Sequence, residues 1–315
     1  MINLDKKIRL ILNRVNKYFF PVRRACLAGT FFMVISTTAC KSRQLPAAGV
    51  ITQPTRLDTG LYRYYDFAHP SIIILGHQLR EISGIAYLQK DSSLLAENDE
   101  EGKLFTVSLK DPSPEHYPSA HFGKKDDYED IAVVDSTAYL LISNGTVVAV
   151  PGFASSAAPK GHVLDQLAGT HNEFETLYYD PGLHSLIMLC KSCHHEKDAG
   201  RNAYRLDIGT GRFADSALYT INIAAIRKKL NDPDAKFFPS AAAIHPLQGN
   251  LYIVSSIGKL LVVAGTDGVV KEAWRLNPDY FRQPEGIAFA PNGDLFISNE
   301  GGDGDATIVR FSYQP

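Results

Sequence analysis

The chain has 315 residues, 45% of them hydrophobic, with 16 Phe and 15 Tyr, a composition that suits a β-rich protein with a large core. Its formal charge is −2, but the charges are unevenly distributed, because the first forty residues carry seven Lys/Arg and one Asp. Without these residues, Lys+Arg falls from 32 to 25 and Asp+Glu from 34 to 33, so the net charge of the rest is −8. A mildly acidic domain argues against nucleic acid as a partner, since that partner requires a basic surface.

Residues 1–40 predict an export signal. Lys17, Arg23 and Arg24 precede an apolar run over residues 25–39, which is shorter than the roughly 20 residues that span a bilayer but suits a signal core. Cys40 ends this run in a sequence resembling a lipoprotein cleavage box, although such boxes usually have Leu where this chain has Thr37. We expect a lipid on Cys40 and a membrane-anchored protein of the cell envelope, periplasmic or at the cell surface. Ordinary signal cleavage and an uncleaved anchor remain alternatives.

Residues 41–60 are polar and small, with Pro46, Gly49 and Pro54, and predict a flexible tether. The folded domain is expected over residues 61–315.

A paired-strand unit recurs five times in that domain. Its five copies begin at Ser83, Glu129, Glu175, Ser240 and Glu285 and end at Asn98, Asn144, Cys190, Ser255 and Asn299. Successive starts are 46, 46, 65 and 45 residues apart. A period near 45 with several short strands per repeat is typical of propeller blades.

The pattern therefore predicts an all-β fold, a single five-bladed β-propeller rather than a six-bladed one. The chain ends after the third strand of its fifth blade, so the missing fourth strand is expected within residues 61–75, where it would close the ring and remove sheet edges. The extra residues before the fourth repeat contain helical spacing over 223–230, which predicts a short helical insertion.

Four of the repeat starts resemble a known family. These are Glu81-Ile82-Ser83-Gly84-Ile85, Tyr128-Glu129-Asp130-Ile131, Phe174-Glu175-Thr176-Leu177 and Pro284-Glu285-Gly286-Ile287-Ala288. Their order and spacing resemble the SdiA-regulated (YjiK-like) β-propeller family of bacterial envelope proteins, over about residues 61–315. The resemblance implies a propeller, an exported or lipid-anchored location, and a distant likeness to gluconolactonase-like and phytase-like propellers, which bind calcium. It implies no particular reaction, and the alanines after Ser240 depart from the pattern.

The topology of a propeller places the repeat starts at one mouth of the central channel, because the innermost strand of each blade lines it. The repeat ends should lie slightly outside them on the same face, and the opposite face should hold ordinary turns. Ser83, Ser240 and Ser255 are expected at the channel mouth.

Three carboxylates converging on a narrow channel repel one another, so their pKa values rise, water screens them or a cation neutralises them. Carboxylate and amide oxygens suit Ca²⁺ or Mg²⁺. The candidate ligands are Glu129, Glu175, Glu285, Asn98, Asn144 and Asn299. The alternative is that these side chains bond to the backbone of neighbouring blades and lock the ring.

The motif Cys190-Lys191-Ser192-Cys193-His194 contains the two cysteines of the expected domain. A disulfide between Cys190 and Cys193 is the favoured interpretation in an oxidising compartment. Free thiols, or a transition-metal site with His194 and His195, remain open. The spacing also matches haem attachment, which we disfavour because nothing helical surrounds the motif.

Two function classes follow. The favoured one is a binding module for an unidentified ligand or envelope protein at the channel face. The other is a cation-dependent hydrolase of the lactonase or phosphoesterase kind, with a channel Glu as base. Phosphate substrates favour convergent cations, and Lys103, Lys191 and Arg201 are the candidates.

Overall fold

The computed structural model describes residues 63–112, 116–167, 172–194, 196 and 199–315. The expected signal and tether, with Cys40, lie outside these ranges, as does His195. The described residues all belong to one compact unit.

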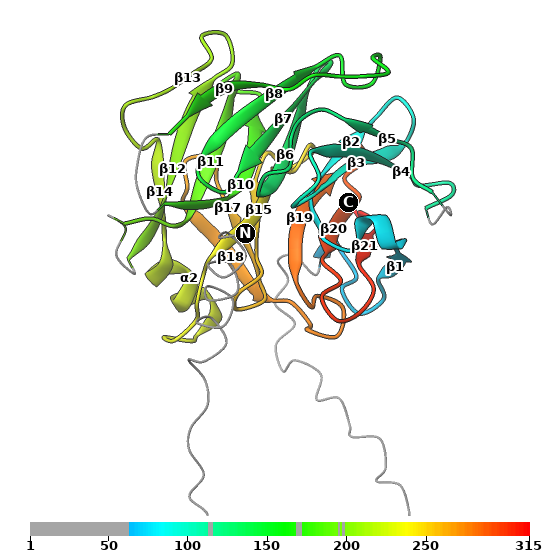
Figure 1. Ribbon diagram of the computed structural model, residues 1–315. Helices are drawn as coiled ribbons and strands as arrows, with labels where there is room; N and C mark the ends of the chain where they lie inside the picture. The colour runs from blue at the N-terminus through cyan, green and yellow to red at the C-terminus, as the bar shows by residue number, and fades with distance from the viewer. Residues whose placement is uncertain (1–62, 113–115, 168–171, 195, 197–198) are drawn as a thin grey trace, which may run out of the picture. The chain divides into compact units, whose positions relative to one another are not determined.

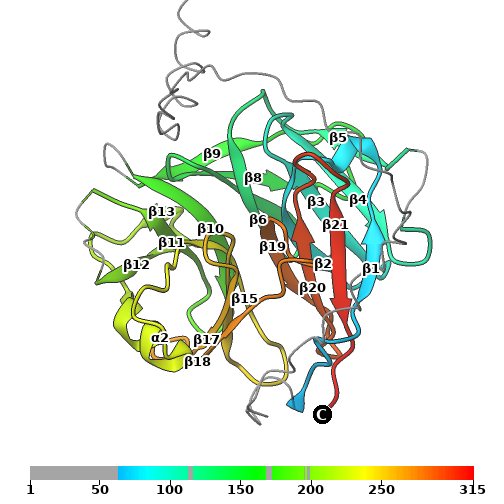
Figure 2. The ribbon, with the colours of Figure 1, turned by 90° about the horizontal axis from the view of Figure 1, so that it is seen from below.

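The unit is a five-bladed β-propeller, as the repeat predicted (Figures 1 and 2). The first three blades run from the channel outward in chain order. Blade 1 has β2 (Ile82–Leu88), β3 (Ser93–Asn98), β4 (Lys103–Ser108) and β5 (Ser119–His121). Blade 2 has β6 (Tyr128–Val134), β7 (Thr137–Ile142), β8 (Thr146–Pro151) and β9 (His162–Gln166). Blade 3 has β10 (Glu173–Asp180), β11 (Ser185–Ser192) and β12 (Gly200–Asp207), with β13 (Arg212–Phe213) and β14 (Tyr219–Asn222) both paired to β12.

The last two blades complete the ring. Blade 4 has β15 (Pro239–Ile244), β16 (Leu251–Ser255), β17 (Leu260–Ala264) and β18 (Val270–Arg275). Blade 5 has β19 (Pro284–Phe289), β20 (Leu295–Asn299), β21 (Thr307–Phe311) and, outermost, β1 (Ser71–Ile74).

Ring closure by the amino-terminal part of the domain is confirmed. β1 pairs antiparallel with β21, from Ser71 opposite Arg310 to Ile74 opposite Thr307. The turn η2 (His77–Leu79) then leads into β2. The earliest and latest strands of the domain thus share a sheet, and blade 5 has its fourth strand.

The expected helix is present as α2 (Ile223–Leu230), between blades 3 and 4. Asn222 caps its amino terminus by accepting a hydrogen bond from the N–H of Ala225, and Ile223 and Ile226 are buried. In the described part of the chain, no helix combines the length and apolar character needed to cross a membrane.

The hydrophobic core consists of five clusters, one between each pair of neighbouring blades. Adjacent blades interdigitate because successive residues of each inner strand face opposite neighbours. Ile131 of β6, for example, packs in the cluster with blade 1, whereas Ala132 packs in the cluster with blade 3. The five inner strands β2, β6, β10, β15 and β19 therefore surround the channel (Figure 2).

Candidate functional site

Each inner strand carries a β-bulge near its start, at the residue that begins the repeat. In β6, Tyr128 pairs with Ile142 and Asp130 with Leu141, so Glu129 has no partner on β7. The same irregularity passes over Glu175, Ser240 and Glu285, and in β2 it passes over Ser83 and Gly84. A bulge bends its strand and redirects a side chain. These bulges give all five repeat starts the same local geometry at one end of the channel.

Glu129, Glu175 and Glu285 interact electrostatically at this end, which we call the acidic mouth. Burial, and next the charge of Glu175, raise the pKa of Glu129 to about 10. Burial, and next Glu175 and Glu300, raise the pKa of Glu285 to about 8. Burial also raises the pKa of Glu175. The fold thus brings the three predicted carboxylates together, and their ionised forms are disfavoured there.

Lys191 supplies positive charge inside this cluster. Its Nζ forms an ion pair with Oε1 of Glu175. Burial alone lowers the pKa of Lys191, but the carboxylates of Glu175 and Glu129 raise it, and the net shift is upward. The same lysine counteracts the pKa increase at Glu129 and Glu285. From the sequence, Lys191 was a candidate only for binding phosphate, and its pairing with Glu175 was not predicted.

Glu97 is a further carboxylate of the acidic mouth. It is 1% exposed, and its Oε1 accepts a hydrogen bond of 2.8 Å from the N–H of Gly84, in the bulge of β2. Its Oε2 is buried and has no hydrogen-bond partner among the described residues. Burial raises the pKa of Glu97 to about 8, and its charge contributes to the raised pKa of Glu129. The acidic sequence of residues 97–101 favours a solvated loop, but Glu97 lies in the interior.

A second group of acids borders the mouth. Burial, and next a hydrogen bond with Glu81, raise the pKa of Glu300 to about 7. Burial, and next the charge of Glu81, raise the pKa of Asp99 to about 6. The excess of negative charge therefore extends beyond the three bulge glutamates.

The three candidate asparagines stabilise local turns or strands. Asn98 accepts a hydrogen bond from the N–H of Glu101, and Asn299 donates to Oγ1 of Thr307 while its own Oδ1 is buried without a partner in the described structure. Asn144 is exposed and accepts from the N–H of Thr146. It does not occupy the position of Asn98 and Asn299, because Ile142 pairs with the residue before the bulge of β6. The turn that joins Val134 to Thr137 is short, and it shifts the pairing of β7 with β6 so that Ile142, and not Asn144, lies opposite the residue before the bulge.

The three predicted mouth serines are buried, and each takes part in a hydrogen bond between a side chain and the backbone. Oγ of Ser240 donates to the carbonyl of Pro284 in the next blade at 2.8 Å. Ser83 accepts, through its carbonyl, a hydrogen bond from Oγ of Ser298 in blade 5. Ser255 accepts from the N–H of Phe238 and donates to the carbonyl of Ile257. Ser240 therefore takes the alternative role of joining neighbouring blades.

A cavity of about 470 Å³ adjoins the acidic mouth between blades 3, 4 and 5. Its lining has two acidic side chains, Glu175 and Glu285, and two basic ones, Lys191 and Lys259. Gln283, Ser256 and Phe238 contribute hydrogen-bonding groups and one aromatic ring. The lining suits a polar ligand that presents both donors and acceptors.

Cys190 and Cys193 are joined by a disulfide at the end of β11. A carboxylate oxygen of Glu196 lies within 4.8 Å of both sulfur atoms. With both sulfurs in a disulfide, a metal thiolate or a haem thioether would require its reduction first. Lys191 lies between the two cysteines in the sequence. The disulfide therefore restrains the segment whose lysine pairs with Glu175.

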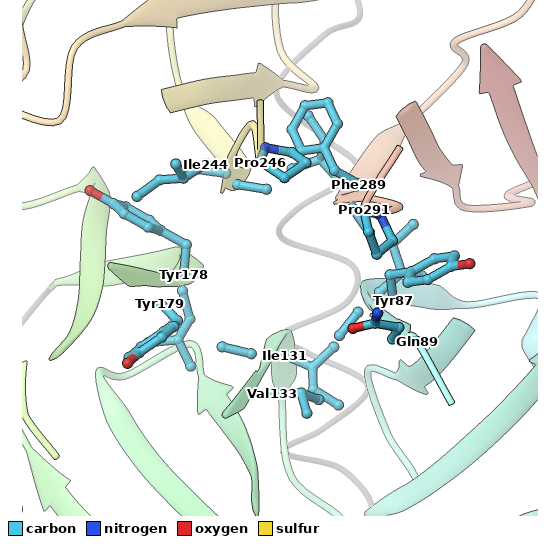
Figure 3. A pocket seen from close by; sticks show the side chains of 18 residues that line it. Tyr87, Gln89, Ile131, Val133, Tyr178, Tyr179, Ile244, Pro246, Phe289 and Pro291 are labelled. Atoms are coloured by element: carbon cyan, nitrogen blue, oxygen red, sulfur yellow. The ribbon is translucent and has the colours of Figure 1, made fainter. Parts of the chain in front are cut away.

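The opposite end of the channel has the expected turns, among them those at Pro246 and Pro291, and a pocket as well. The pocket has a volume of about 340 Å³ and is lined by the far ends of the inner strands, with Tyr87, Tyr179 and Phe289 around the opening (Figure 3). The pocket was not predicted from the sequence, although an aromatic or branched aliphatic residue stands four positions after each repeat start.

No family model and no curated protein matches this sequence. Several solved structures are similar in fold. A putative oxidoreductase (glucose dehydrogenase) from Thermus thermophilus has a TM-score of 0.52 at 12% identity, covering 77% of this chain and 100% of that one. The PQQ-bound aldose sugar dehydrogenase from Streptomyces coelicolor has a TM-score of 0.51 at 14% identity, covering 78% and 99%. Glutaminyl cyclase from Myxococcus xanthus has a TM-score of 0.50 at 15% identity, covering 78% and 98%. At these identities the similarity shows a β-propeller fold.

Proposed function

We propose that this protein is an exported, lipid-anchored β-propeller of the SdiA-regulated (YjiK-like) type that acts as a binding module. Its ligand, a polar small molecule or a segment of an envelope protein, binds in the cavity beside the acidic mouth. A divalent cation, Ca²⁺ or Mg²⁺, is held by the carboxylates of that mouth.

The observation that carries this proposal is an excess of buried carboxyl groups over basic side chains. Glu97, Glu129, Glu175 and Glu285 all have raised pKa values. Lys191 pairs with one of them, and burial lowers the pKa of Lys259, the other lysine of the cavity. The carboxylates must therefore take up protons or a cation near neutral pH. Oε2 of Glu97 is buried and has no hydrogen-bond partner within the described part of the chain, so it is available to coordinate a cation.

The donor set is made of oxygen atoms, which suits Ca²⁺ or Mg²⁺ better than a softer metal. In the described structure, the group of three potential ligands within 4.8 Å of one another is Cys190, Cys193 and Glu196 rather than the mouth glutamates. A cation therefore has to draw the glutamate side chains inward or be held partly through water, which Mg²⁺ commonly keeps. The candidate amides are less suited, because Asn98 and Asn144 already accept backbone hydrogen bonds.

The test is calorimetric titration of the chelator-treated protein with CaCl₂ and with MgCl₂, together with thermal unfolding. At a cation concentration of about 100 Kd, the expected stabilisation is about 2.7 kcal/mol. For a domain of this size, that raises the melting temperature by roughly 5–10 °C. Glu129→Gln and Glu285→Gln should weaken cation binding at least about tenfold.

The matched control is Asp111→Asn, the same change at an exposed carboxyl that follows β4. It should bind the cation as the original protein does. No heat of binding and no change in melting temperature with either cation would refute the cation site and leave an ion-paired, protonated cluster.

Membrane anchoring depends on Cys40 and is tested separately. Labelled fatty acid should be incorporated into the full chain expressed in a bacterial host and not into Cys40→Ala. Release of an unlabelled, cleaved protein from both would support ordinary signal cleavage instead.

Hydrolysis is the second candidate function. The pKa of Glu285, about 8, suits general acid–base catalysis near neutral pH, and Glu285 lines the cavity with Lys191. A bound cation would polarise the oxygen of a substrate. A panel of lactones and phosphoesters assayed with Ca²⁺ distinguishes the two functions, because turnover that is lost in Glu175→Gln and Glu285→Gln would establish an enzyme.

A further inference from the structure

The pocket opposite the acidic mouth is built from equivalent positions of the five blades. Four residues after each repeat start stand Tyr87, Val133, Tyr179, Ile244 and Phe289, all half-buried. Figure 3 shows them around one opening with Gln89, Pro246 and Pro291. We call this pocket the aromatic mouth.

The aromatic mouth is separate from the acidic mouth. Its inner end is formed by residues two positions after each repeat start, among them Ile85, Ile131 and Ile287, which are 2%, 3% and 4% exposed. At about 3.3 Å per residue along a strand, this apolar layer lies roughly 7 Å from the bulges. The lining of this pocket and that of the cavity beside the acidic mouth share no residue.

The pocket is uncharged. Its eighteen lining residues, all within the described part of the chain, include no Asp, Glu, Lys or Arg. The hydroxyl of Tyr179 is bonded to Nδ1 of His184, and that of Tyr178 to the hydroxyl of Tyr219. Gln89 is the amide side chain at the rim. Each inner strand is also an edge strand of its sheet. The N–H and C=O groups along its unpaired edge therefore face the channel.

We propose that the aromatic mouth binds a small, neutral molecule built on an aromatic or aliphatic ring. A volume of about 340 Å³ is at the small end of the range for ligand pockets. Tyr and Phe rings favour stacked or edge-on contact with another ring. A charged ligand would lose its hydration without gaining a counter-charge, so the site selects against charge.

Three naphthalene probes that differ in charge test this proposal. 2-Naphthol is neutral at pH 7, 2-naphthoate is an anion, and 2-(aminomethyl)naphthalene is a cation. Equilibrium dialysis of the full domain with each probe gives its affinity. 2-Naphthol should bind at least about tenfold more tightly than either charged probe.

Two substitutions locate the binding. Val133→Trp fills the pocket and should abolish 2-naphthol binding, whereas the control Val269→Trp, at a residue 61% exposed and outside the pocket, should not. Gln89→Glu, at an exposed rim position, should leave the fold intact and improve binding of the cationic probe several-fold. Equal binding of all three probes, or unchanged 2-naphthol binding in Val133→Trp, would overturn the proposal. Absence of 2-naphthol binding would overturn it as well, and concentration-dependent self-association in that case would make this face a contact between copies of the chain.

Discussion

The carboxylate of Asp130 on β6 accepts a hydrogen bond from the backbone N–H of Leu177 on β10, with 2.7 Å between Oδ2 and the nitrogen. Its Oδ1 accepts a second hydrogen bond, of 2.8 Å, from the N–H of Ile131. Asp130 is buried and so joins the second blade to the third. Its neighbour Glu129, in the bulge, belongs to the acidic mouth. Two consecutive acids thus have different roles, because one faces the next blade and the other the channel.

Asp130→Ala should destabilise the domain substantially. The substitution leaves the buried N–H of Leu177 without an acceptor, and an unsatisfied buried donor costs about 1–3 kcal/mol. Unfolding in guanidinium chloride measures the difference. Asp130→Asn keeps one acceptor oxygen and should cost less. Asp111→Ala, at an exposed site, is the control, and an Asp130→Ala protein as stable as this control would contradict the inter-blade role.

Gly84→Ala should also destabilise the domain, for a steric reason. A Cβ at Gly84 would lie 2.6 Å from both Cα of Asp130 and the nitrogen of Ile131, which are backbone atoms of the neighbouring inner strand. Overpacking against backbone of this kind costs about 1–3 kcal/mol. Gly209→Ala is the control, because its nearest contact would be 3.5 Å, to Oδ1 of Asp207. Equal melting temperatures for the two variants would show that blades 1 and 2 can move apart at no cost.

Stability in the presence of chelator should decrease as the pH rises above about 4.5. In the unfolded chain the glutamates titrate near their ordinary pKa of 4.5, whereas in the folded protein the pKa is about 8 for Glu97 and Glu285 and about 10 for Glu129. Between these values the folded protein binds more protons than the unfolded chain, so the free energy of unfolding falls with pH. Carboxyls with a lowered pKa, such as that of Asp294, act in the opposite direction at lower pH.

Melting temperatures between pH 5 and pH 9 measure this dependence. Glu129→Gln should flatten the profile, since an amide does not titrate, and Asp111→Asn should leave it unchanged. Saturating Ca²⁺ should flatten it as well if the cation neutralises the cluster. Stability that rises over this interval would show that the glutamates are ionised and well paired in the folded protein.

The repeat was sufficient to predict the blades. The unit from Glu285 to Asn299 has two apolar strands around the turn at Asn292-Gly293, and its five copies predicted five blades. The missing fourth strand of the fifth blade predicted the closing strand. The bulges were not predicted, because a bulge depends on how the second strand pairs. Asn144 shows the consequence: the spacing suggested equivalence with Asn98, but the shorter turn in blade 2 removes it.

The burial of single polar residues was also beyond the sequence. Glu97 stands in the acidic run Glu97-Asn98-Asp99-Glu100-Glu101, which indicates a solvated loop. Glu97 is buried because it lies on β3 opposite the bulge of β2. Asp130 differs from Glu129 by one position, and strand alternation separates their roles. The aromatic mouth was predictable in principle from the large apolar residues four positions after each repeat start.

Lys191→Met should separate the two ways in which the acidic mouth can be neutralised. Methionine keeps an unbranched side chain of similar bulk but removes the charge that pairs with Glu175. The chelated protein should become less stable, because Glu175 then faces Glu129 and Glu285 without its counter-charge. If Lys191 competes with a divalent cation for these carboxylates, the variant should bind Ca²⁺ roughly tenfold more tightly, a gain of about 1.4 kcal/mol.

Lys103→Met, which breaks the more exposed pair with Glu101, is the control and should change neither quantity. Loss of stability that Ca²⁺ does not restore would mean that Lys191 is the resident counter-ion of the cluster.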